Sequence, residues 1–162
     1  MKLKPLIALA ALLAGTAFAQ TVSVTDAWAR ATVSGQKATG AFMKITAQDG
    51  ARLVGVQSPV AGVTEIHEMK MDRDVMKMSA IAELDLPAGK TIELKPGSYH
   101  VMLMDLKQAL SKDSTVPLTL QFVDAKGKAS RLDIKVPVSA MPPGGAMPGG
   151  MPSGHSHGDH KH

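Results

Sequence analysis

Two short segments of the chain combine histidine with methionine. The first contains His67, Met69 and Met71 and continues, after a turn, through Met76 and Met78. Imidazole and thioether both bind metals, and the soft, neutral thioether favours Cu(I) over metals that prefer thiolate or carboxylate ligands. The chain has 11 methionines and no cysteine, which excludes thiolate sites and disulfides. This composition predicts copper binding through neutral ligands.

The second segment is shorter and has the spacing of a β-strand. His100, Met102 and Met104 occupy alternate positions. Side chains at i and i+2 share one face of a strand, so we expect these three to point the same way. One histidine on an apolar face is more often a core residue. Two histidines, each with methionine at strand spacing, favour a metal site.

A hairpin would position the first segment. Residues 64–71 and 75–81 are expected to pair as antiparallel strands around a turn centred on Asp72-Arg73. In that register His67 lies opposite Met78. Opposed residues have Cβ atoms about 4.5–5.5 Å apart, close enough for both side chains to bind one ion. His67 and Met78 are therefore predicted to form one half of a site.

His100 and Met102 are predicted to form the other half, and the four ligands converge if their strand or its loop lies over the end of the hairpin. The same register places Met69 opposite Met76, and a slip of one residue would undo the arrangement. Met43 is expected to be a core residue. For four other methionines, core packing, support of a ligand and metal ligation all stay open: Met69, Met71, Met76 and Met104.

These spacings resemble the motif of the PCuAC family of periplasmic copper chaperones. Ten residues separate His67 from Met78, 21 separate Met78 from His100, and Met102 completes His-x-Met. The resemblance covers residues 21–138. It implies a cupredoxin-like β-sandwich without blue-copper ligands, in which these four residues bind Cu(I). It also implies delivery of Cu(I) to the copper-bearing subunit of cytochrome c oxidase, beside a thiol-bearing assembly protein of the Sco type.

The rest of the chain predicts an all-β fold, an antiparallel sandwich or barrel. Apolar runs are separated by Gly-, Pro- and Asp-containing turns about every ten residues. Besides the hairpin, the expected strands are residues 21–28, 41–46, 52–56, 91–94, 99–106, 116–123 and 129–136.

Residues 1–19 are typical of a secretory signal peptide. Lys2 and Lys4 precede an apolar stretch from Pro5 to Gly15, and Ala17-Phe18-Ala19 forms the cleavage site. The stretch is too short to span a bilayer, and no cysteine follows it to carry a lipid. Cleavage would lower the formal charge from +4 to +2. We expect a domain at 20–138 that is periplasmic, soluble, monomeric and not stably inserted in a membrane.

Residues 139–162 are predicted to form a disordered tail because glycine and proline are dense there. The remaining residues are mostly metal donors: Met141, Met147, Met151, His155, His157, His160 and His162. Imidazoles at His-x-His spacing can bind Cu(II), and thioethers can bind Cu(I). A tether near the folded site gives an effective concentration of about the millimolar range. The tail is predicted to capture a second copper; the alternative is incidental affinity for copper, nickel and zinc.

Other function classes find little support in the sequence. No Ser/His/acid arrangement, pair of catalytic carboxylates or phosphate-binding glycine loop is present, so an enzyme is not expected. Interleaved charges and few aromatic residues argue against nucleic-acid binding. Two rivals stay open. One is a periplasmic copper-storage or resistance protein that sequesters copper, and the other is a structural β-sandwich whose methionine-rich face is only core.

Overall fold

The computed structural model describes residues 22–144, which form ten strands and no helix. The strands are β1 (Val22–Arg30), β2 (Ala38–Ala47), β3 (Ala51–Gln57), β4 (Ala61–Asp72), β5 (Val75–Ile81), β6 (Leu84–Leu86), β7 (Thr91–Leu94), β8 (His100–Leu106), β9 (Thr115–Asp124) and β10 (Ala129–Ser139). The expected all-β class is confirmed. Over this described range, no helical segment has the length and apolarity needed to cross a bilayer.

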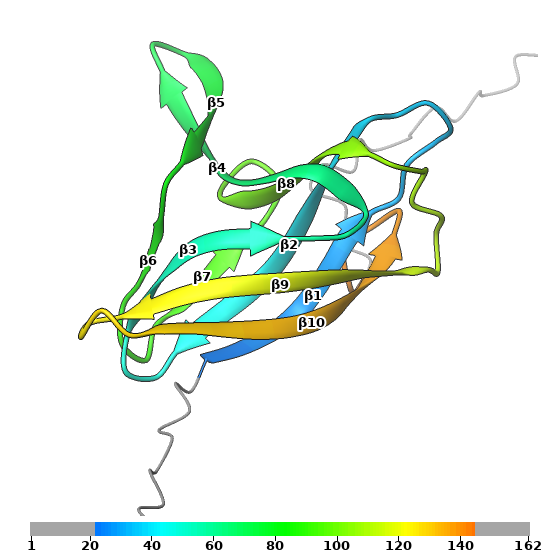
Figure 1. Ribbon diagram of the computed structural model, residues 1–162. Helices are drawn as coiled ribbons and strands as arrows, with labels where there is room; N and C mark the ends of the chain where they lie inside the picture. The colour runs from blue at the N-terminus through cyan, green and yellow to red at the C-terminus, as the bar shows by residue number, and fades with distance from the viewer. Residues whose placement is uncertain (1–21, 145–162) are drawn as a thin grey trace, which may run out of the picture.

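The strands form the two layers of a β-sandwich (Figure 1). Their order is β5-β4-β8-β2-β1-β10-β9-β3-β6, and β7 pairs with β2. Strands β1 and β10 run parallel where Ala29 lies beside Val138. This short parallel contact joins the layer that contains β5, β4, β8, β2 and β1 to the layer that contains β10, β9, β3 and β6.

The core lies between the layers and is almost entirely aliphatic. In β8 and β9, one strand from each layer, buried residues largely alternate with more exposed ones, as expected for strands with one face packed on a core. Fully buried side chains include Ile45, Leu53, Leu103, Leu118, Leu120 and Phe122. Met43 is also in this core and 1% exposed, as the sequence predicted.

Strands β4 and β5 extend beyond the sandwich as a two-stranded hairpin (Figure 1). Asp72 pairs with Val75, so the turn consists of Arg73 and Asp74. Both turn residues have positive φ, 47° and 65°. Two-residue hairpin turns need this conformation to match the twist of the strands, and aspartate tolerates it better than most residues.

The predicted register of the hairpin is therefore wrong by two positions. His67 lies opposite Ala80, not Met78, and Met69 lies opposite Met78, not Met76. The turn is centred one residue later than expected, and moving the centre by one residue moves each partner by two. A shift of two keeps every side chain on its face of the sheet, because side chains alternate with a period of two.

Candidate metal centre

His67 and His100 lie side by side on neighbouring strands. They are direct partners in the β4–β8 ladder, and their ring centroids are 5.7 Å apart. Ile66 and Val101, the adjacent residues, point into the core, which places both imidazoles on the opposite face. Strand β8 thus lies beside the hairpin strand β4 in one sheet and not over the end of the hairpin. This brings the two predicted half-sites together.

The imidazole of His100 is held by the backbone. Its Nδ1 lies 3.0 Å from the carbonyl oxygen of Ser98. A carbonyl oxygen only accepts hydrogen bonds, so this contact assigns the proton to Nδ1. The neutral ring then carries its lone pair on Nε2. Histidines that bind metals usually have their other nitrogen oriented in this way.

His67 has one nitrogen paired and one without a partner. Its Nε2 lies 2.7 Å from Oε2 of Glu65. Its Nδ1 is buried and has no hydrogen-bond partner among the described residues. Leaving a buried polar atom unsatisfied costs roughly 1–3 kcal/mol. When Nε2 donates to the carboxylate, Nδ1 carries a lone pair, which is the arrangement that a bound metal ion would satisfy.

The two predicted methionines flank this histidine pair on the same face. Met102 is half-buried on β8, between Glu65 on β4 and Gly40 on β2. Met78 is diagonal to His67, and Cβ atoms in diagonal positions are somewhat less than about 7–8 Å apart, within reach of a long side chain. The residue directly opposite His67 is Ala80, whose methyl group leaves room for this approach.

The donor set selects a soft metal. Within residues 22–144, no group of three or more His, Cys, Asp or Glu side chains is arranged to hold a metal ion. A metal bound by the two imidazoles would therefore depend on thioethers for further ligands. Thioethers favour Cu(I). The residues present thus fit a copper site better than a zinc or iron site.

Beside His100 lies a cluster of three residues that the sequence did not single out as functional. The ring of Phe42 lies 6.3 Å from that of His100 and 4.7 Å from that of Trp28, measured between centroids. The guanidinium of Arg30 lies 5.8 Å from the Phe42 centroid and 6.0 Å from the Trp28 centroid. Both aromatic rings are buried but are outside the core between the layers. They form a second apolar cluster, which shields one side of the histidine pair.

A glycine makes room for this aromatic cluster. A Cβ atom at Gly40 would lie 2.7 Å from the ring of Phe42, which is far closer than van der Waals contact. Gly40 also pairs with Met102, so the ring and the thioether occupy space that any larger residue would take. The Gly40-Ala41-Phe42 sequence was the available signal for this cluster, although nothing in it indicates the contact with His100.

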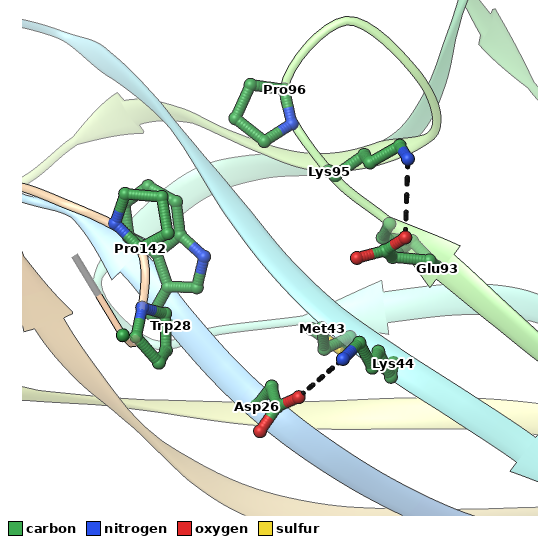
Figure 2. A pocket seen from close by; sticks show the side chains of 11 residues that line it. Asp26, Trp28, Met43, Lys44, Glu93, Lys95, Pro96 and Pro142 are labelled. Carbon is green, nitrogen blue, oxygen red and sulfur yellow. Dashed lines mark hydrogen bonds and ion pairs between the residues drawn. The ribbon is translucent and has the colours of Figure 1, made fainter. Parts of the chain in front are cut away.

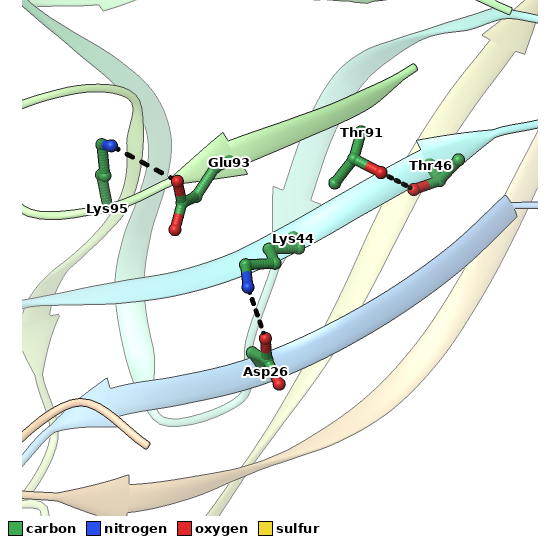
Figure 3. A network of polar contacts seen from close by, with 6 residues as sticks. All are labelled: Asp26, Lys44, Thr46, Thr91, Glu93 and Lys95. Atoms are coloured by element: carbon green, nitrogen blue, oxygen red, sulfur yellow. Dashed lines mark hydrogen bonds and ion pairs between the residues drawn. The ribbon is translucent and has the colours of Figure 1, made fainter. Parts of the chain in front are cut away.

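A separate groove of about 700 Å³ lies beside Trp28, where the chain leaves β10 (Figure 2). Pro142, Pro143 and Gly144 line it together with Trp28 and Pro96. The charged residues that line it form ion pairs with one another (Figures 2 and 3). Lys44 lies 2.7 Å from Asp26, and Lys95 lies 3.3 Å from Glu93. The hydrogen bond from Lys44 to Asp26, followed by the attraction between their charges, raises the pKa of Lys44. Exposed ion pairs of this kind contribute little to stability.

The predicted tail lies mostly outside the described residues. Of its donors only Met141 is described; it is 36% exposed, and its amide donates to Oγ of Ser139. The others lie beyond residue 144: Met147, Met151, His155, His157, His160 and His162. The predicted signal peptide, residues 1–19, also lies outside the described range.

Comparison with known proteins places this chain in a family. A family model described as "Putative lipoprotein LpqE-like" matches residues 22–138. The chain is 35% identical over 115 residues to "Putative lipoprotein Lxx21020" of Leifsonia xyli subsp. xyli, covering 70% of this chain and 69% of that protein. It is 32% identical over 109 residues to the uncharacterized protein RP573 of Rickettsia prowazekii, of whose length it spans 60%.

Solved structures with the same fold include PCuAC domains. The apo PCuAC domain from PmoF1 superimposes with a TM-score of 0.60 at 25% identity, covering 74% of this chain and 94% of that one. Apo-DR1885 from Deinococcus radiodurans superimposes with a TM-score of 0.56 at 27% identity, covering 86% and 92%. The fold thus defines a β-sandwich of the PCuAC type. The chain belongs to the LpqE-like family, and the resemblance to PCuAC proteins is confirmed.

Proposed function

We propose that this protein is a periplasmic copper chaperone that carries Cu(I) and is not an enzyme. The observation that supports this best is the pair of buried imidazoles 5.7 Å apart, on a face that also carries Met78 and Met102. DR1885, which this chain resembles at 26% identity with a TM-score of 0.54, has also been solved in a form titled CuI-DR1885.

The proposed ligands are His67, Met78, His100 and Met102. Two of them form a buried inner side, because His67 and His100 are 7% and 6% exposed, whereas Met78 is 51% exposed. Copper would thus be held by imidazole from within and remain accessible through a thioether from outside. All four ligands are neutral, so releasing Cu(I) leaves no anionic ligand that must take up a proton. This combination suits a carrier.

The proposed acceptor is the copper-bearing subunit of cytochrome c oxidase, with a Sco-type thiol protein acting beside this one. Both follow from the family resemblance. Removal of residues 1–19 would release a soluble, monomeric domain into the periplasm, where a thioether site cannot be lost to disulfide formation. Methionine can still be oxidised to the sulfoxide, so copper binding would be sensitive to strong oxidants.

We further propose that the tail binds a second copper, as Cu(II) or Cu(I), through Met141, Met147, Met151, His155, His157, His160 and His162. The position where the tail begins supports this role. Arg30 pairs with Ser139, and Pro142 and Trp28 line one groove. Trp28 contacts Phe42, which contacts His100, so the tail starts on the same side of the sheet as the folded site.

Titration with Cu(I) against a competing chelator tests the folded site. The matched protein is the full chain with the tail donors replaced by serine, so that copper bound by the tail is not counted. We expect His67→Ala and Met102→Ala each to weaken Cu(I) binding at least tenfold. Unchanged affinity in both variants would leave the structural β-sandwich as the better description.

A transfer assay separates delivery from storage. Copper-loaded protein is mixed with the apo copper domain of the oxidase subunit, and the metal content of each protein is measured after separation. A chaperone transfers Cu(I), and its deletion lowers oxidase activity in the cell. Absence of transfer together with normal oxidase activity in a deletion strain would favour a copper-storage protein.

A further inference from the structure

The β4–β5 hairpin carries two pairs of methionines beyond the histidines. Met69 lies opposite Met78, and Met71 lies opposite Met76. All four share one face of the hairpin with His67, because they are two or four positions from it or from its partner Ala80. We call each pair of directly opposed residues on this face a rung. The rungs run from Met71–Met76 near the turn, through Met69–Met78, to His67–Ala80.

These methionines do not fill the core. Met71 is 64% exposed, Met76 is 45% exposed and Met78 is 51% exposed, and this part of the hairpin projects beyond the sandwich (Figure 1). Core packing, one of the alternatives left open for Met71 and Met76, is therefore excluded. Solvent-exposed strands favour β-branched, aromatic or charged residues. Four flexible thioethers at this position need another explanation.

The other face of the same hairpin has the opposite chemistry. Lys70 pairs with Lys77 across the strands, and Lys70 Nζ lies 2.7 Å from Oε1 of Glu68. The hydrogen bond to Glu68, followed by the attraction of its charge, raises the pKa of Lys70. The hairpin thus separates charged side chains on one face from neutral sulfur donors on the other.

We propose that Met71 and Met76, with Met69 and Met78, form a second Cu(I) site made of thioethers alone. Opposed Cβ atoms about 4.5–5.5 Å apart let two methionines bind one ion. Successive rungs are two residues apart along a strand, which is about 6.6–6.8 Å, so a third thioether from the next rung is within reach. Thioethers without anionic partners favour Cu(I). This inference rests on the proposed function, because it extends the same metal-bearing face.

Met78 connects the two sites. It belongs to the thioether rungs and is also the proposed ligand beside His67. Cu(I) can therefore pass from the hairpin to the histidine pair by ligand exchange, in which a bond from copper to Met71 or Met76 sulfur breaks as one to an imidazole nitrogen forms. The copper keeps its charge, and no proton or electron moves. The outer site is the entry or exit position for the inner one.

Exposed methionines also serve as adaptable surfaces for protein docking. Two observations favour a metal instead. Each of the four methionines faces another methionine across the hairpin, which is the arrangement that shared coordination requires and that docking does not. The two rungs also continue directly into the histidine rung and share Met78 with the proposed site.

Nuclear magnetic resonance of methionine methyl groups can test the proposal. The full chain, with its tail donors replaced by serine and its methionines labelled with 13C at the methyl group, is titrated with Cu(I) under anaerobic conditions. Leucine variants assign the signals. We expect the first equivalent to shift Met78 and Met102, and the second to shift Met71 and Met76. The methyl group of Met43, buried in the core, is the internal control and stays in place.

A double variant tests the proposal through the number of Cu(I) ions bound per protein. Met71→Leu with Met76→Leu keeps the size and apolarity of both side chains and removes the sulfur atoms. We expect it to bind one Cu(I) fewer than the parent protein while Met102 still shifts with the first equivalent.

The outcomes separate this site from the inner one. Methyl signals of Met71 and Met76 that stay fixed to two equivalents, or an unchanged copper count in the double variant, would show that the hairpin site is wrong. The inner site would stand if Met102 responds. Shifts at Met71 and Met76 without any at Met102 would support the hairpin site and contradict the inner one.

Discussion

Glu65 fixes the orientation of the His67 ring through a hydrogen bond. Its carboxylate lies 2.7 Å from Nε2 of His67, and the other ring nitrogen is the buried atom without a partner. A carboxylate in this position orients the imidazole and raises its basicity, and loss of such a partner typically lowers metal affinity 10–100-fold. Glu65 is thus expected to matter for copper binding although it is not one of the four proposed ligands.

We predict that Glu65→Ala weakens Cu(I) binding by about 10–100-fold, measured by competition with a chelator. Glu65→Gln should weaken it less, because the amide oxygen still accepts the hydrogen bond. Glu68→Ala is the control, since Glu68 lies on the opposite face of β4 and bonds to Lys70. Equal affinities for Glu65→Ala and Glu68→Ala would contradict the role of the carboxylate.

Two methionines of β8 are expected to differ in the same way. Met102 is next to the histidine rung, whereas Met104 is one rung further away, opposite Val63. We predict that Met102→Leu lowers Cu(I) affinity at least tenfold and that Met104→Leu leaves it within about twofold of the parent protein. The same chelator competition measures both affinities. A larger loss of affinity in Met104→Leu than in Met102→Leu would show that Met102 is not the ligand from β8.

Some residues at and around the site could be predicted from the sequence, and others could not. His67, Met78, His100 and Met102 follow from donor chemistry and from spacing that matches a family motif. Trp28, Phe42 and Arg30 could not be found in this way, because their role depends on the pairing of β1, β2 and β8. No local pattern contains that pairing.

At the scale of strands, Gly40 decides whether the aromatic cluster can form. We predict that Gly40→Ala destabilises the fold by about 1–3 kcal/mol, the usual effect of overpacking, because the Phe42 ring is buried and packs against Trp28. Urea denaturation monitored by Trp28 fluorescence measures this.

Gly55→Ala is the matched control. Its new Cβ would meet Oε1 of Gln121 at 2.7 Å, but this atom is the end of a flexible side chain and can rotate away. A destabilisation by Gly55→Ala as large as that by Gly40→Ala would show that any methyl group is costly in these strands, and would remove the specific role of Phe42.

The strands themselves were largely predictable, and the two errors have physical causes. Strand β6 was missed because Leu84–Leu86 has only three residues, too few to show alternation, and it is a strand because it pairs with β3. The turn was misplaced because Asp72-Arg73-Asp74 contains two possible pairs of central residues and no glycine to decide between them. The error left every side chain on its predicted face of the hairpin, so the predicted site residues still share one face.

At the scale of the whole molecule, copper should act as a stabilising ligand. The proposed donors come from three neighbouring strands, β5, β4 and β8, so a bound ion would cross-link them only in the folded state. A ligand present at about 100 times its dissociation constant stabilises the native state by about 2.7 kcal/mol. We predict a rise in Tm of roughly 5–20 °C with Cu(I), given about 2–8 °C per kcal/mol for domains near this size.

Thermal unfolding by circular dichroism, with and without Cu(I), measures this rise. A strong Cu(I) chelator should reverse it, and the double variant His67→Ala with His100→Ala should show a clearly smaller rise. A rise of the same size in the double variant would mean that copper stabilises the molecule from another position, such as the hairpin or the tail.

The direct pairing of His67 with His100 would make copper loading of the proposed site depend on correct folding. In a chain that has not folded, 32 residues intervene between the two imidazoles, and each is only one weak donor among many. The pair forms when β8 aligns beside β4, and a slip of one residue would turn one ring into the core. An unfolded or wrongly folded chain therefore lacks the paired imidazoles, so the proposed folded site would bind copper only after β4 and β8 have paired.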